Sequence, residues 1–327
     1  MNFGRSPMLV GRNFGVWLGR VESTRTERMS LHIDPAENKG VPVKLPRIIW
    51  SFWEEGFEAA PPLVQLCVAT WRKHSGIRDI RLLHSENIHS YLTRQDLPIT
   101  FESLPVQMKS DAIRLALLSR YGGIWLDAST LVTAAVHNYV EAAAGDAGFF
   151  AFQNGITGKG GRWFEIGVLA ATPQHPFVVS WSASFKDFFS REKIHLAHSP
   201  SGPAPWWVKV FFGLLNRRLR KSPSRSALWV KAPLRFLPFY PYFVTYYLAN
   251  RLMLTPTFSE TLRQMKFEPA NDYLWFRNEL NHGRGLYALG DLLGSGPPLS
   301  DVEFRTDVTD TDLRLISTGL GLSWKVF

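Results

Sequence analysis

The chain has 327 residues, of which 45% are hydrophobic and 20% are charged, and its formal net charge is +9. This composition is that of a globular protein and excludes a chain too polar to bury a core. The single cysteine, Cys67, excludes an internal disulfide, so a reducing compartment such as the cytoplasm is expected.

Residues 1–43 are predicted to be an N-terminal lead-in, because they are basic and show no clear periodicity. Arg5, Arg12 and Arg20 interrupt the first twenty residues, which therefore do not resemble a signal peptide. No stretch reaches the roughly 18 apolar residues of a membrane-spanning helix. We therefore expect a cytoplasmic protein.

The first regular elements follow residue 44. Residues 47–50 are predicted to form a buried strand, a helix is predicted from Pro61 to Gly76, and residues 80–83 form the next predicted strand. Proline suits the first turn of a helix, and glycine commonly ends one. A strand, a helix and a strand in under forty residues indicate a βαβ unit and a mainly parallel sheet with helices outside it.

The next elements carry the candidate site. A helix is predicted over 105–120, Gly122 and Gly123 end it, and residues 124–126 form a short strand. Further strands are predicted over 149–152 and 167–171, and a helix over 176–189. The regular alternation fades after residue 200, and we expect a mostly helical C-terminal region.

Three side chains in this stretch suggest a site for a phosphate-bearing ligand. Asp111 and Arg114 are three residues apart on one helix and share a face, while Asp127 follows a buried strand. Open α/β sheets bind ligands at that edge. A carboxylate there can hold Mg²⁺ or Mn²⁺, and an arginine can pair with phosphate. Taken singly, each feature is more often a solvated helix pair or a turn residue.

The sequence around these residues resembles the bacterial capsular polysaccharide synthesis protein family, which is related to glycosyltransferases with a DxD sugar-binding motif. The family pattern "P-x-I-I-W-x-x-W" matches residues 46–53, and "S-D-x-x-R-x-x-x-L-x-x-x-G-G-x-W-x-D" matches residues 110–127. Residues 321–325 are similar to the family's C-terminal "K-L-T-W-K" ending. The resemblance spans roughly residues 44–325.

The resemblance implies an α/β fold of the GT-A type, in which a Rossmann-like mixed sheet is flanked by helices and binds a nucleotide-sugar at its strand ends. It implies a hexosyltransferase-like activity toward a polysaccharide or lipid-linked glycan acceptor, with retention of anomeric configuration as a further expectation. Donor contacts are implied for Ile49, Trp50, Trp53, Asp111, Arg114, Gly122, Gly123, Asp127 and Ser129. Asp127 and Asp111 are the catalytic candidates.

The sequence departs from the DxD pattern in one position. It reads Asp127-Ala128-Ser129, so the second acid is missing, and a serine hydroxyl is a poor ligand for Mg²⁺ or Mn²⁺. Asp127 is the one candidate metal ligand. A metal-dependent site and a metal-independent site therefore both remain open.

Three more candidates follow from neighbouring strands. Gln153 and Asn154 come after a predicted strand that would end near the site, so they are candidate sugar contacts, with ordinary turn chemistry as the alternative. Glu165 stands just before the next strand, where the family tends to carry polar residues on the acceptor side. It is a candidate base or sugar contact.

All of the excess positive charge lies in one segment. No acidic residue occurs between Glu192 and Glu260, and this stretch holds ten basic residues and many aromatic ones; without it, 27 basic residues face 28 acidic ones. Basic residues interleaved with bulky aromatic ones are typical of protein segments that bind an anionic membrane surface. A helical core with a solvated basic face is the main alternative. Nucleic acid is disfavoured because no nucleic-acid motif accompanies the segment.

We therefore predict a lead-in over 1–43, a GT-A-like catalytic core over 44–200 and a basic, aromatic region over 201–327 that faces acceptor or membrane and completes the core. The expected activity is that of a glycosyltransferase, peripheral at the inner membrane. The alternative is a non-catalytic nucleotide-sugar or glycan-binding component of a polysaccharide assembly complex, which the serine at position 129 would suit.

Overall fold

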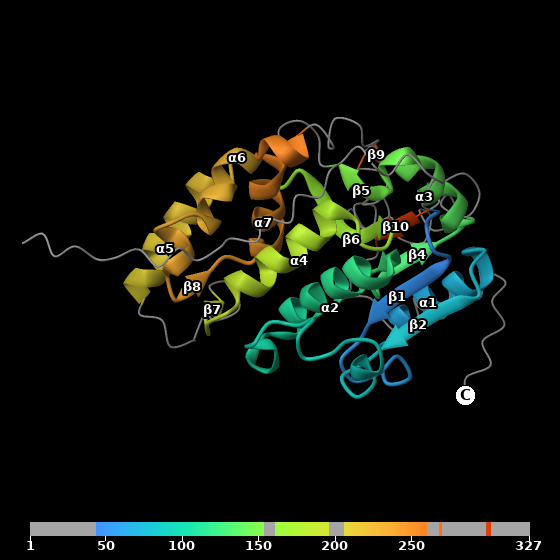
Figure 1. Cartoon of the computed structure of the whole chain (residues 1–327). Helices are drawn as coiled ribbons and strands as arrows, with labels where there is room; N and C mark the ends of the chain where they lie inside the picture. Colours follow the sequence, from blue (N-terminus) through green and yellow to red (C-terminus); the bar gives the residue numbers. More distant parts are fainter. Residues whose placement is uncertain (1–43, 154–160, 196–205, 260–267, 270–298, 302–327) are drawn as a thin grey trace, which may run out of the picture. The chain divides into compact units, whose positions relative to one another are not determined.

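The computed structural model describes residues 44–153, 161–195, 206–259, 268–269 and 299–301. These residues form a mixed α/β fold around a six-stranded sheet with the strand order β2-β1-β3-β6-β5-β9 (Figure 1). The strands of this sheet are β1 (Ile48–Phe52), β2 (Asp79–Leu83), β3 (Gly123–Leu126), β5 (Phe149–Gln153), β6 (Phe164–Ala171) and β9 (Glu268–Pro269).

The sheet is accompanied by seven α-helices in the described ranges: α1 (Pro62–His74), α2 (Val106–Tyr121), α3 (Val136–Ala144), α4 (Pro176–Phe188), α5 (Trp206–Leu219), α6 (Pro223–Ser226) and α7 (Val244–Met253). Two small sheets pair β4 (Thr130–Val132) with β10 (Leu299–Asp301), and β7 (Ile194–His195) with β8 (Phe239–Tyr240). Within these ranges, every helix falls short of the length and apolar character needed to cross a bilayer.

The predicted βαβ unit is confirmed, but the strand directions are mixed. Strand β1 pairs in parallel with β2 and β3, whereas β6 runs antiparallel to both β3 and β5. The chain between β5 and β6 is shorter than the dozen or so residues that a parallel crossover needs. The expectation of a mainly parallel sheet is therefore right for β1 to β3 and wrong for β6.

Local sequence explains where the main helices begin and end. Helices α1 and α4 each begin with proline in the first turn, where its missing N–H costs no hydrogen bond. Helix α2 begins after Pro105 and ends at Gly122, whose φ of +63° a side chain would strain. This sharp turn feeds the chain directly into β3.

Side chains of the sheet alternate between two hydrophobic layers. Ile49 and Ile124 face the layer that contains α1 and α3, while Trp50 and Trp125 face the layer that contains α2 and α4. Buried residues of α5 and α7 belong to that second layer, so residues 206–259 share a core with α2, α4 and the sheet. The predicted boundaries at residues 43 and 200 stay predictions.

Candidate active site

The sheet topology brings four candidate residues to one edge. Strand β1 lies between β2 and β3, so the strand order reverses there. Open α/β sheets bind ligands outside the carboxyl ends of the strands at such a reversal. Trp53 follows β1 and Asp127 follows β3. Because β6 is antiparallel to β3 and β5, Glu165 near its start and Gln153 at the end of β5 reach the same edge.

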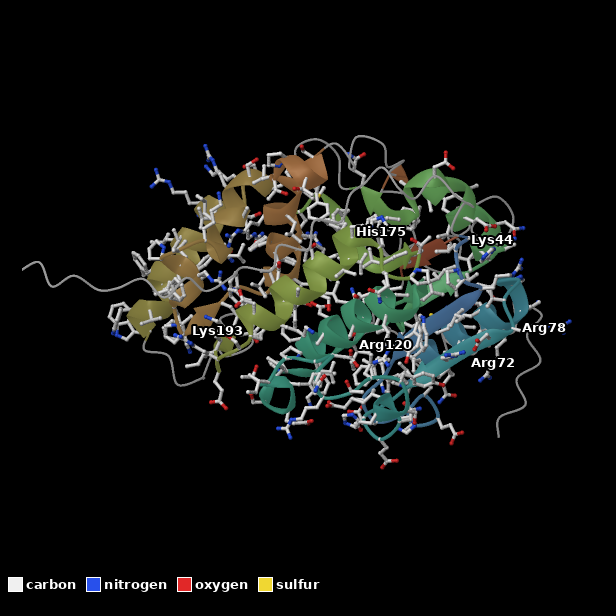
Figure 2. All side chains as sticks on the ribbon, in the orientation of Figure 1. Lys44, Arg72, Arg78, Arg120, His175 and Lys193 are labelled. Carbon is white, nitrogen blue, oxygen red and sulfur yellow. The ribbon has the colours of Figure 1, made fainter. Side chains whose placement is uncertain are left out.

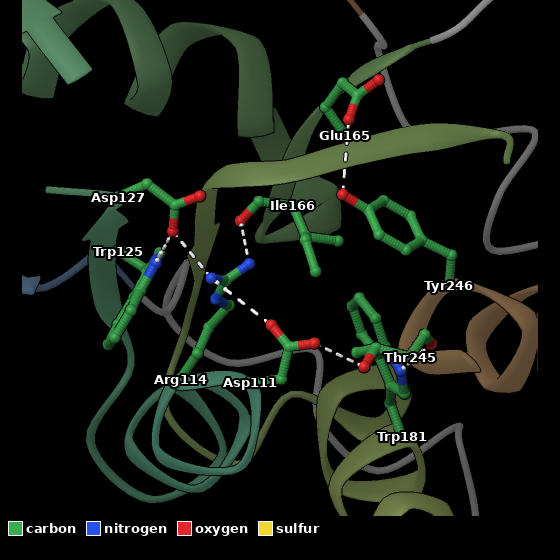
Figure 3. Close-up of polar contacts among 9 residues, drawn as sticks. All are labelled: Asp111, Arg114, Trp125, Asp127, Glu165, Ile166, Trp181, Thr245 and Tyr246. Atoms are coloured by element: carbon green, nitrogen blue, oxygen red, sulfur yellow. Dashed lines mark hydrogen bonds and ion pairs between the residues drawn. The ribbon is translucent and has the colours of Figure 1, made fainter. Parts of the chain in front are cut away.

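Asp127 is held by one of its two carboxylate oxygens. Arg114 Nη2 and Trp125 Nε1 both donate to Oδ1, each over 2.7 Å (Figure 3). The Asp127 side chain keeps 36% of its surface exposed, and in the described part of the chain no group donates to Oδ2. Partial burial raises the pKa of Asp127, and the Arg114 charge opposes that rise. The carboxylate is thus fixed in orientation with one oxygen available to a ligand.

Arg114 lies at the buried centre of the cluster and not at its surface. Its Nη1 donates to the backbone oxygen of Ile166 over 2.6 Å, and its Nη2 also lies 3.5 Å from Asp111 Oδ1. Its side chain is only 4% exposed and lies over the Trp125 ring. The geometry therefore favours a positioning role for Arg114, and the expected direct contact with the donor stays a prediction.

Asp111 connects the cluster to the C-terminal region. Thr245 Oγ1, from α7, donates to Asp111 Oδ2 over 2.5 Å. Burial raises the pKa of Asp111 to about 6, although the Arg114 charge and the Thr245 hydrogen bond both act to lower it. Asp111 is buried on α2, so the geometry supports a structural role beside Arg114 more than contact with a sugar.

Glu165 is the centre of a second polar cluster, next to that of Asp111, Arg114 and Asp127. Its Oε2 accepts from Arg162 Nη1 over 2.9 Å and from the Tyr246 hydroxyl over 3.4 Å (Figure 3). The Arg162 guanidinium lies 4.4 Å from the Phe243 ring centre. The charge of Glu165 also acts to raise the pKa of Asp127, so the two carboxylates are close enough to interact.

Three residues on or next to β1 are predicted to contact the donor, and they differ in how deeply they are buried. Ile49 and Trp50 are fully buried, and Trp50 Nε1 donates to the backbone oxygen of Gly122 over 2.9 Å. Trp53 is half-buried at the strand end. The donor contacts expected of all three stay predictions, and Trp53 is the one whose placement favours contact with a ligand.

The turn after β3 contains the serine that replaces the second acid. Ser129 is half-buried between Asp127 and β4. Strand β10 pairs with β4 so that Asp301 lies opposite Thr130 in the backbone register. Gly122 and Gly123 lie at the amino end of β3, opposite the end that leads to Asp127, and the donor contacts expected of them stay predictions. Asn154 lies outside the described residues.

Four residues of the cluster were not identified from the sequence. Trp125 stands inside the matched motif, two residues before Asp127 on the same side of the strand, and this spacing could have indicated it. Arg162, Thr245 and Tyr246 carry no local signal, because they reach the site through loop and helix packing.

Comparison with known proteins gives a family and distant relatives. The family described as capsular polysaccharide synthesis protein matches residues 18–198, more than half of the chain. The O-glycosyltransferase braB of Annulohypoxylon truncatum is 27% identical over 164 residues, covering 44% of this chain and 38% of that protein. The glycosyltransferase afumC of Aspergillus fumigatus is 32% identical over 98 residues, covering 26% and 25%.

The chain thus spans less than two fifths of the length of either curated relative. Among solved structures, the PaToxG glycosyltransferase matches with a TM-score of 0.35 and 11% identity, over 84% of this chain and 83% of that one. That structural likeness is too low to assign a fold type.

Proposed function

The chain belongs to the capsular polysaccharide synthesis protein family, and from this membership and the geometry at Asp127 we propose that it is a glycosyltransferase. It moves a sugar from a nucleoside diphosphate sugar to a hydroxyl of a growing polysaccharide or lipid-linked glycan. The observation that carries the proposal is a carboxylate at the carboxyl edge of the sheet with Oδ1 fixed by two donors and Oδ2 open. Two relatives whose names describe glycosyltransferases support it.

In this reaction the bond between the anomeric carbon and the diphosphate oxygen breaks, and the acceptor oxygen bonds to that carbon as its proton leaves. Asp127 Oδ2 is suited to accept a hydrogen bond from a donor hydroxyl, because Arg114 and Trp125 fix the carboxylate before the donor arrives. The departing diphosphate oxygen takes the acceptor's proton, because Glu165, the candidate base, is buried with only 6% of its side chain exposed. The hydrogen bonds from Arg162 and Tyr246 hold Glu165 at the same edge.

Asp127 is the one residue at which we propose that a divalent cation could bind. In the described ranges, no group of three or more acidic, histidine or cysteine side chains could hold a metal ion. Asp127 would be the residue that holds a cation such as Mg²⁺, through Oδ2 in place of the hydroxyl contact, because this ion commonly binds proteins through only one or two carboxylates. Such an ion would neutralise the charge of the leaving diphosphate.

We also propose that the sheet is of the GT-A type and that transfer retains the anomeric configuration. The support for the fold type is the reversal of strand order at β1, with Trp53 and Asp127 following the two neighbouring strands β1 and β3 at the same edge of the sheet. The support for retention is the resemblance to DxD enzymes. The donor sugar and its base depend on pocket walls outside this cluster.

The test is nucleotide release from a panel of UDP-, GDP- and CDP-sugars, with and without Mn²⁺. We expect Asp127→Asn to lower release by about 100-fold or more, the scale of losing one aligned electrostatic contact. The matched control is Asp79→Asn, because Asp79 also pairs with an arginine, Arg81, but on the exposed side of β2. Circular dichroism checks that both variants fold.

Normal release by the Asp127→Asn protein would remove Asp127 from the site. Tight nucleotide binding in calorimetry without release, with acceptor glycans supplied, would favour the non-catalytic binding component, for which Ser129 in place of an acid is the supporting observation. The absence of any nucleotide binding would contradict both functions. Retention is read from the anomeric configuration of the product by nuclear magnetic resonance.

A further inference from the structure

Helix α5 presents an apolar band on its exposed side. Trp206, Trp207, Val210, Phe211 and Leu214 are between 53% and 76% exposed. Their spacing places them along one side of the helix, while Val208, Phe212 and Leu219 on the other side are buried against the protein. The helix is therefore apolar on both of its sides.

Such a band is not the ordinary outer side of a surface helix. A surface helix normally turns charged or polar residues to water, and single exposed apolar residues need no explanation. Here five large apolar residues lie within nine positions, two of them tryptophan. A band of this size indicates a surface that binds an apolar partner.

The charges beside the band indicate what that partner is. The C-terminal end of α5 and the turn after it carry Arg217, Arg218, Arg220 and Lys221, none of which forms an ion pair with an acidic side chain in the described part. A pocket of about 490 Å³ is lined by Gly213, Asn216, Arg217, Arg220 and Lys221. Three basic side chains around one pocket suit a phosphate group.

We propose that α5 docks the protein on an anionic lipid bilayer. The apolar band lies among the upper acyl chains, with the tryptophans at the level where indole rings concentrate in membranes, and the basic end of the helix binds lipid phosphates. A second copy of this chain would bring the same uncompensated bases against one another, which disfavours self-association as the use of this surface. The proposal goes beyond sugar transfer and does not depend on it.

The test is flotation of the full chain with vesicles of neutral phosphatidylcholine and with vesicles that contain about a third anionic phosphatidylglycerol. We expect at least about tenfold stronger binding to the anionic vesicles, and about a tenfold loss in Trp206→Ser/Phe211→Ser. The apolar control is Ile99→Ser, an equally exposed residue outside α5. It should bind as the wild type does.

A second pair of variants tests the charge. Arg217→Glu/Arg218→Glu should weaken binding by about tenfold or more. Arg72→Glu/Lys73→Glu makes the same change in net charge on α1, and Arg72 lies at the far end of the described part from α5 (Figure 2). That control should lose little, because distant exposed charges are screened by salt.

Two outcomes would overturn the proposal. One is vesicle binding by the α5 variants equal to that of the wild type. The other is a lipid-free chain that sediments as a dimer and becomes monomeric on Trp206→Ser/Phe211→Ser, which would make the band a self-association surface. The single Trp206→Ser variant repeats the test if the double variant fails to fold. Because binding is read without a sugar donor, neither result bears on the transferase activity.

Discussion

At the scale of single residues, the candidate site depends on a buried arginine that binds two carboxylates at once. Arg114 Nη2 is 2.7 Å from Asp127 Oδ1 and 3.5 Å from Asp111 Oδ1. Burial of Arg114 and Asp111 is tolerated because each has a further hydrogen-bond partner, the Ile166 carbonyl for Arg114 and the Thr245 hydroxyl for Asp111. The arrangement fixes the orientation of the Asp127 carboxylate before a ligand binds, so the site is electrostatically preorganised.

The raised pKa of Asp111 predicts how stability depends on pH. The folded state binds a proton at Asp111 up to about pH 6, against an ordinary pKa of 3.8. This group therefore stabilises the fold most below about pH 4, and that contribution decreases as the pH rises through about 6. The free energy of unfolding of the wild type minus that of Asp111→Asn should fall by up to about 3 kcal/mol between pH 4 and pH 7.

Urea unfolding followed by tryptophan fluorescence at a series of pH values measures this difference. Thr245→Val is the companion variant. It removes a hydrogen bond to the charged form of Asp111, so the midpoint of the wild-type pH dependence should move upward in its presence. A difference that stays flat across this range would show that Asp111 is ionised throughout and that its contacts outweigh its burial.

At the scale of elements, the turn from α2 to β3 determines where Asp127 lies. Gly122 has φ +63° and ψ −155°, and a Cβ there would lie 2.6 Å from the Ala171 oxygen of β6 and 2.6 Å from the Pro173 nitrogen. The close approach lets β3 leave the helix within one residue and pair with β6. A wider turn would displace the strand that ends at Asp127.

Gly122→Ala and Gly145→Ala separate backbone strain from steric contact. Gly145 has nearly the same backbone, φ +49° and ψ −145°, but nothing lies within 4 Å of a Cβ built there. We expect Gly145→Ala to lower the free energy of unfolding by about 1–3 kcal/mol through strain alone. Gly122→Ala should cost at least about 2 kcal/mol more, because the contact adds overpacking.

Equilibrium denaturation in urea measures both costs, and activity assays on the same samples show whether β3 has moved. Similar costs for the two variants would mean that β6 and the segment after it relax to accept the added methyl group. In that case the close approach would not be what holds β3 in place.

The elements that the sequence predicts well are those with a strong local pattern. The bounds of α1, β1, β2, α2 and β3 differ from the predicted ones by one or two residues, because proline, glycine and apolar periodicity mark them. Strands β4 and β10 have three residues each and no alternation long enough to detect. The direction of β6 depends on a connection whose path no local pattern specifies.

The candidate site likewise contains residues that the sequence identifies and residues that it does not. Asp111, Arg114 and Asp127 are found by the spacing of one motif, and the structure joins them in one cluster. Thr245 is 134 residues from Asp111 and contacts it only because α4 packs against both α2 and α7. A contact of that kind follows from the packing of whole helices, which spacing along the chain does not express.

At the scale of the whole molecule, residues 206–259 are part of the core rather than an attachment to it. Trp181 of α4 donates through Nε1 to the Thr245 oxygen of α7 over 2.9 Å, and Tyr240 and Phe189 are in edge-on ring contact. Val208, Phe212, Trp229, Tyr247 and Leu248 are buried in the same layer as α2 and α4. Removing them would expose the apolar side chains of α4 that pack against α7.

A chain that ends at residue 200 should therefore fail to fold cooperatively, although it retains most of the sheet and the whole of the matched motif. Burial of large side chains contributes about 1.5–3 kcal/mol each, so the loss of several exceeds the stability of an ordinary domain. A chain that begins at residue 42 is the control, because the described core begins at Leu45. Calorimetry should show one sharp transition for this control and none for the shortened chain, whereas a sharp transition in the latter would make residues 44–200 an independent domain.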